Sequence, residues 1–154
     1  MKHQTVDQAR RVAAVLAQPA LPVMSRSQRL ERWADLLEQR SGTVRLLRGT
    51  EYAATAEWDH MREDASPLSV AFGDPVLREE GLAGDSYGEA MRFFGIGNAG
   101  LHEIACHCHY GSNAIASSAE VAARVRRVAA GVRRTEQFAQ AVRGIRSRIA
   151  SAFG

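Results

Sequence analysis

Histidine and cysteine are concentrated in one short segment, Leu101 to His109, which holds three of the five histidines and both cysteines of the chain. Imidazole nitrogen and thiolate sulfur are the ligands that zinc prefers in proteins. If this segment is a helix with Asn98 as its N-cap, then His102, Cys106 and His109 lie along one face at positions i, i+4 and i+7. These three residues are the candidate metal ligands, and zinc is the candidate ion.

One helix by itself does not complete such a site, because His102 and His109 would be separated by about 10 Å of helix rise. Further ligands must come from elsewhere in the chain. The additional candidates lie upstream and are Asp59, His60 and Glu63. The segment also departs from the zinc-protease motif His-Glu-x-x-His, because Cys106 stands where the second histidine belongs.

A structural role for the same residues is the main alternative. Cysteine often behaves as a small buried apolar residue, and histidines beside a core face commonly form hydrogen bonds. On the predicted helix, Leu101, Ile104, Ala105 and Cys108 form the core face. Thiol sensing is a further alternative, but a disulfide between Cys106 and Cys108 requires the helix to break first, because their side chains point about 200° apart.

Arginine dominates the C-terminal part of the chain. From Ala119 onward there are eight arginines and two glutamates, a net charge of +6, so the rest carries −3 of the total +3. Clustered guanidinium groups neutralise phosphates, which raises a nucleic-acid function as a second alternative. The candidate contacts are Arg124, Arg126, Arg127, Arg133 and Arg134.

An apolar stripe on the same segment favours ordinary helix packing instead. The stripe comprises Val121, Val125, Val128 and Val132 and is expected to continue through Phe138, Val142, Ile145, Ile149 and Phe153. Arginine then serves as the solvent-facing residue, and no aromatic residues are interleaved for base stacking. A stripe of this kind also suits dimerisation, a partner helix or an anionic membrane surface.

Capping chemistry predicts the helices that position these segments. Serine followed three residues later by glutamine or glutamate marks three helix starts: Ser25 with Gln28, Ser86 with Glu89, and Ser117 with Glu120. An N-cap followed by proline marks two short helices, at Ser66-Pro67 and Asp74-Pro75. We expect two more helices, over about residues 4–17 and 43–62.

No convincing strand pattern is present, so we predict an all-α bundle of six to eight helices without a significant sheet and with a long C-terminal helix or helix pair. The stretch from Asp64 to Gly84 is expected to pack on the body as a compact elbow. The pattern G-x-G-x-x-G from Gly95 to Gly100 matches a dinucleotide-binding fingerprint, but a predicted helix precedes it where a strand is required. We therefore interpret it as a helix end and turn.

Composition bounds the class of protein. Hydrophobic residues make up 45% and charged residues 24%, which are ordinary globular values, and no apolar run approaches a membrane span. Residues 1–23 are predicted to be an N-terminal helical arm or extension, and residues 24–154 a single helical domain. Two closely spaced cysteines suit a reducing cytoplasm better than a secreted disulfide framework.

No pair of carboxylates or nucleophile context specifies a reaction. The leading hypothesis is therefore a small non-catalytic protein that acts through a protein partner or self-association. Metal binding or thiol sensing at His102, Cys106 and His109 is the first alternative, and nucleic-acid association is the second.

Overall fold

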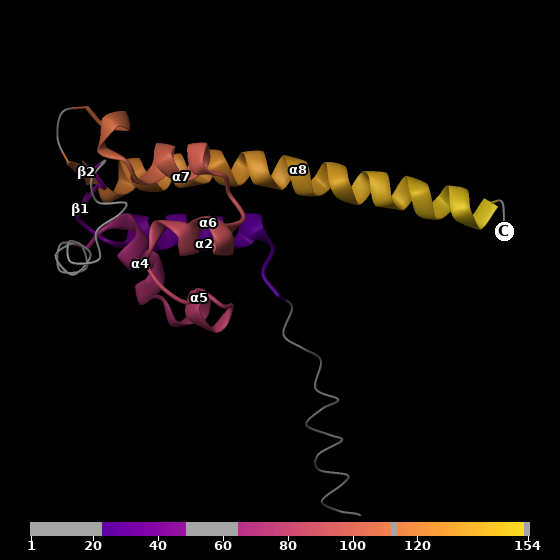
Figure 1. Ribbon diagram of the computed structural model, residues 1–154, viewed down its shortest axis with the longest axis horizontal. Helices are drawn as coiled ribbons and strands as arrows, with labels where there is room; N and C mark the ends of the chain where they lie inside the picture. Colours follow the sequence, from indigo (N-terminus) through magenta and orange to yellow (C-terminus); the bar gives the residue numbers. More distant parts are fainter. Residues whose placement is uncertain (1–22, 49–64, 112–113, 153–154) are drawn as a thin grey trace, which may run out of the picture.

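The computed structural model describes residues 23–48, 65–111 and 114–152, and these residues are mostly helical (Figure 1). The elements in chain order are α2 (Arg26–Gln39), β1 (Thr43–Arg45), α4 (Pro67–Gly73), α5 (Pro75–Glu79), α6 (Tyr87–Phe94), α7 (Asn98–Ala105), the 3₁₀ helix η1 (His107–His109), β2 (Ile115–Ser117) and α8 (Ser118–Ala152). The all-α class is confirmed. The predicted helix over 4–17 lies outside the described residues, and the boundary between 1–23 and 24–154 stays a prediction.

Helices α2 and α8 form an antiparallel pair that the other elements cover (Figure 1). Residue numbers rise along α2 as they fall along α8: Ser27 binds Glu136, Glu31 binds Arg133, and Glu38 binds Arg126. The predicted face of α2 is confirmed, since Leu30, Trp33, Ala34 and Leu37 are fully buried. This helix pair is the scaffold on which the histidine segment rests.

The core is continuous across the described part of the chain. The Trp33 ring stacks on Phe94 of α6 with ring centroids 4.7 Å apart, and the Trp33 indole donates a hydrogen bond to the Pro67 carbonyl. Burial of such large side chains contributes about 1.5–3 kcal/mol each. The elbow also packs on this core as predicted, because Leu68 and Leu77 are buried.

The helix starts predicted from serine and aspartate caps are confirmed, with local differences in how each cap is made. Ser25 and Gln28 form a complete reciprocal capping box at the start of α2. Ser66 and Asp74 cap α4 and α5, each followed by proline. At α6 only half of the box forms: Ser86 accepts from the Glu89 amide, while the Glu89 carboxylate accepts from another backbone amide.

The glycine-rich turn between α6 and α7 is a helix end, as predicted. Gly95 ends α6 in the left-handed conformation, with φ of 61°. The turn favours glycine for its backbone angles, and a Cβ at this position would lie 2.3 Å from the Cδ of Arg26, so the arginine side chain would have to move. The next helix begins at Asn98, which was predicted to be the N-cap; Gly97 takes that position instead.

A small sheet replaces the beginning of the predicted helix over 43–62. Thr43, Val44 and Arg45 pair antiparallel with Ser117, Ala116 and Ile115. The helix prediction is wrong at these residues, because β-branched Thr43 and Val44 find partners in the segment before α8. Residues 49–62 lie outside the described part.

Helix α8 is one continuous helix rather than a pair, and only its first half packs on the body. Val121 and Val125 are buried, and Val128 and Val132 pack against the core. Phe138 and Ile145 are exposed, so the prediction of one continuous stripe is wrong. The step of six residues from Val132 to Phe138 rotates the side-chain direction by about 120°. No helix among the described residues is long and apolar enough to cross a membrane.

Candidate metal centre

The histidine segment is held by hydrogen bonds to a strand region far away in the sequence. The Leu47 amide donates to the Ala105 carbonyl at 2.8 Å, and the His107 amide donates to the Leu47 carbonyl at 3.1 Å. Cys106 therefore adopts an extended conformation, with φ of −91° and ψ of 135°, and α7 ends at Ala105. The predicted alignment of His102, Cys106 and His109 on one helix face is wrong, because the helix ends before Cys106.

The break sends the two cysteines to opposite environments. Cys106 is 2% exposed and belongs to the core, where burial, and then the neighbouring Cys108, raises the pKa of its thiol to about 12. This environment disfavours the thiolate, which is the form of cysteine that binds metals. Cys108, predicted on the core face, is exposed instead. The other predicted core residues of the segment, Leu101, Ile104 and Ala105, are buried.

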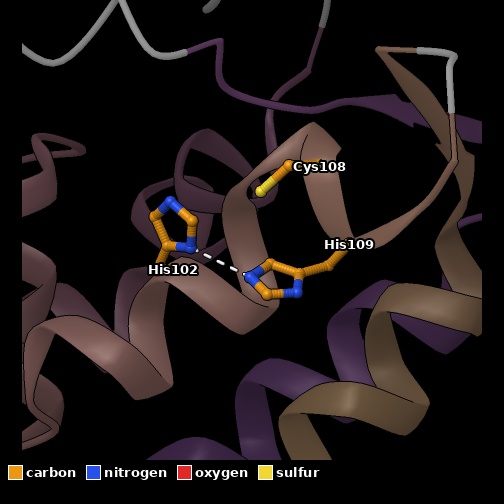
Figure 2. Close-up of side chains that lie close together, drawn as sticks. All are labelled: His102, Cys108 and His109. Atoms are coloured by element: carbon orange, nitrogen blue, oxygen red, sulfur yellow. Dashed lines mark hydrogen bonds between the residues drawn. The ribbon is translucent and has the colours of Figure 1, made fainter.

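The 3₁₀ turn of η1 brings a different set of ligands together. Figure 2 shows His102 of α7 facing His109 of η1, with the Cys108 sulfur beside them. The Nδ1 of His102 and the Nε2 of His109 are 2.9 Å apart, and the ligand atoms of all three residues lie within 4.8 Å of one another. Cys108 and His109 are exposed and His102 is half-buried, so an ion can reach the group from solvent.

Neighbouring side chains fix η1 against α7 and α8. The Tyr110 hydroxyl donates to the Ile104 carbonyl at 2.6 Å, and the Arg124 guanidinium lies 4.0 Å from the centre of the Tyr110 ring. Arg124 also donates to the His109 carbonyl. Burial raises the pKa of Tyr110, so its hydroxyl remains a hydrogen-bond donor. The backbone that carries His109 is thus held on both sides.

The group suits a tetrahedral ion with small side-chain adjustments. In a zinc site with bonds of 2.0–2.3 Å, ligand atoms are about 3.3–3.6 Å apart. The two imidazole nitrogens must therefore separate by a few tenths of an ångström, and the longest separation must shorten. Three protein ligands leave one tetrahedral position for water or another small ligand.

The signal that could have located the break is compositional. Cys106, His107, Cys108, His109 and Tyr110 are consecutive weak helix formers. Such a run yields readily to a competing strand partner. The additional predicted ligands Asp59, His60 and Glu63 lie outside the described residues.

Comparison with protein-family models, curated proteins and solved structures found no match for this chain.

The predicted nucleic-acid contacts form ion pairs within the protein at four of the five positions. Arg126 binds three carboxylates of α2, those of Glu31, Asp35 and Glu38, at 2.6–2.9 Å. The remaining pairs are Arg124 with Glu120, Arg127 with Glu103, and Arg133 with Glu31. Arg134 is exposed. Pairing with carboxylates reduces the positive charge that these arginines can offer to phosphates.

Proposed function

We propose that this protein binds a divalent transition-metal ion of the zinc class through His102, Cys108 and His109. The observation that carries the proposal is the convergence of one thiol and two imidazoles, with all ligand atoms within 4.8 Å. Sulfur and nitrogen donors together favour zinc over calcium or magnesium, which prefer oxygen. The proposal keeps both histidines of the sequence hypothesis and replaces Cys106 with Cys108.

Metal binding accounts for the position of the Cys108 thiol beside the two histidines, which a hydrogen bond between the histidines alone does not explain. The ion would join the end of α7 to η1 and replace the hydrogen bond between the two rings, whose nitrogens are 2.9 Å apart. Two free cysteines also suit a reducing compartment, and we propose the cytoplasm as the setting.

The test is a titration of metal-free, untagged protein with Zn²⁺ by calorimetry and with Co²⁺ by absorption spectroscopy. We expect about one ion per chain, and a thiolate-to-cobalt charge-transfer band that reports the sulfur ligand. Cys108→Ala should abolish this band. His102→Gln and His109→Gln should each weaken binding by more than about 100-fold, beyond the usual effect of losing an outer partner.

Neighbouring residues of the same types provide matched controls. Cys106→Ala and His107→Gln should retain binding, because Cys106 faces the core and His107 is not part of the group. If wild-type protein binds neither ion, or if Cys108→Ala binds as tightly as wild type, the proposal is wrong. Loss of binding in Cys106→Ala with retention in Cys108→Ala would restore the original ligand set.

A further inference from the structure

The second half of α8 carries an exposed apolar surface that the other described elements do not cover. Among the described residues, four large apolar side chains are more than half exposed, and two of them are Phe138 (72%) and Ile145 (57%) of α8. Figure 1 shows that this half of α8 extends past the ends of the other described elements. We call Phe138, Val142 and Ile145 the α8 seam.

The spacing of the seam residues is that of one helix in a coiled coil. Phe138, Val142 and Ile145 are spaced by four and then three residues, and Ile149 continues this spacing in the sequence. At about 100° per residue they fall within about 60° of the helix circumference. A seam this narrow suits a single facing helix, whereas globular or membrane packing uses a wider apolar face.

Positive charge flanks the seam on both sides. Arg146 and Arg148 lie about 80° to either side of Phe138 around the helix. Residues 137–152 contain three arginines and no acidic residue. The segment therefore offers no carboxylate of its own that a second copy could place beside the seam in either orientation, and a partner rich in carboxylates is favoured.

The first half of α8 shows how this helix binds such a partner. There, α2 lies antiparallel to α8, and its carboxylates bind the arginines beside the buried stripe. Glu31 alone accepts from both Arg126 and Arg133, at 2.9 and 2.5 Å. The seam faces about 120° away from this contact, so α2 does not cover it.

We propose that the α8 seam binds an acidic amphipathic helix of another protein, with apolar residues facing Phe138 and Ile145 and carboxylates facing Arg146 and Arg148. This inference does not depend on the metal site. It deepens the sequence hypothesis of a protein that works through a partner by naming the surface and the chemistry of that partner.

The probes are two synthetic helical peptides of about 21 residues, three heptads each, with leucine at the seam positions. One peptide has glutamate at the flanking positions and the other has lysine. We expect full-length protein to bind the glutamate peptide at least about tenfold more tightly, with an affinity that falls as salt rises. Fluorescence anisotropy measures both affinities.

Charge reversal makes the test specific. The variant Arg146→Glu with Arg148→Glu should reverse the preference in favour of the lysine peptide. Phe138→Ser with Ile145→Ser should weaken both peptides by at least about tenfold. Arg143→Glu is the matched control, because Arg143 lies about 140° from Phe138 around the helix and should leave the preference unchanged. Circular dichroism checks that each variant keeps its helix content.

Three outcomes would overturn the proposal. Equal affinity for the two peptides, or none for either, removes the acidic helix as the occupant. Concentration-dependent dimerisation that Phe138→Ser with Ile145→Ser abolishes assigns the seam to a second copy. Binding to vesicles that contain phosphatidylserine, without preference for the glutamate peptide, assigns it to an anionic membrane surface.

Discussion

Cys106 and Cys108 are two residues apart, yet Cys106 is buried and Cys108 is exposed. The extended backbone at Cys106 turns its thiol into the core, while the turn of η1 leaves Cys108 beside two imidazoles. Helical spacing grouped Cys106 with the two histidines, whereas the structure places Cys108 beside them. The residue types indicated which segment holds the candidate ligands, and the backbone conformation determines which of their side chains lie together.

Asp74 is a second residue with a defined role. Its carboxylate accepts hydrogen bonds from Arg32 of α2 and caps α5, and it is almost fully buried. The hydrogen bond from Arg32 is the main reason that the pKa of Asp74 lies below its usual value, although burial opposes it. The pair joins the elbow to the central helix.

A carboxyl group with a lowered folded-state pKa stabilises the protein above its unfolded-state pKa, and this stabilisation is lost as pH falls through the folded-state value. We expect the free energy of unfolding to fall as pH drops below about 4, with a shallower fall in Asp74→Asn. At neutral pH, Asp74→Asn should cost about 1–3 kcal/mol, since asparagine keeps the cap but loses the charged pair. Urea denaturation of both proteins across this pH range is the measurement, and identical pH dependence would count against this role.

At the scale of elements, the α2–α8 pair ends at a specific polar contact. Glu136 accepts a hydrogen bond from the Ser27 hydroxyl at 2.6 Å and from the Arg26 amide at 3.1 Å. A carboxylate at this end of α2 is favoured by unpaired amides and by the helix dipole. Burial alone raises the pKa of Glu136, but these hydrogen bonds outweigh it and the net pKa is lowered. The contact marks where α8 leaves the body.

Glu136→Ala should therefore loosen the start of α2. We expect a loss of about 1–2 kcal/mol in unfolding free energy and faster hydrogen exchange at the amides of the first turn of α2. Glu120→Ala is the matched control, since Glu120 is half-exposed and pairs within α8. Equal effects of the two substitutions would show that the contact between α8 and α2 adds no more to the unfolding free energy than an ion pair within α8.

At the scale of the whole molecule, the described residues form a folded body and a helical segment that projects from it (Figure 1). The core includes α8 only as far as Ala129, with Val132 packed against it. Beyond Glu136, most described side chains of α8 are exposed. The body carries the candidate metal site, and the projecting segment carries the candidate partner seam.

Removal of residues 138–154 should accordingly leave the body folded. We expect the melting temperature to change by less than about 3 °C, because most side chains described in this segment, residues 138–148, are exposed. Calorimetry of the truncated and full-length proteins is the measurement. A truncated chain that unfolds or aggregates would mean that this segment stabilises the body through contacts beyond those described.

The sequence by itself determined the features that depend on neighbouring residues. Ser25, Ser66 and Asp74 cap helices where their spacing predicts, and the 3.6-residue repeat of Leu30, Trp33 and Leu37 identifies the buried face of α2. These signals are local, since a cap or a helix face is set within one or two turns. The all-α class follows from them.

Only the tertiary structure decided the features that depend on residues distant in sequence. The end of α7 at Ala105 results from hydrogen bonds to Leu47, and β1 forms because Val44 pairs with Ala116. The exposure of Phe138 follows from where the body ends along α8, which its own periodicity does not encode. Helix propensities of most residue types differ by only a few tenths of a kcal/mol. A backbone hydrogen bond to a distant partner contributes about 1 kcal/mol, and burial around it adds to this. Such contacts therefore override the local helix preference.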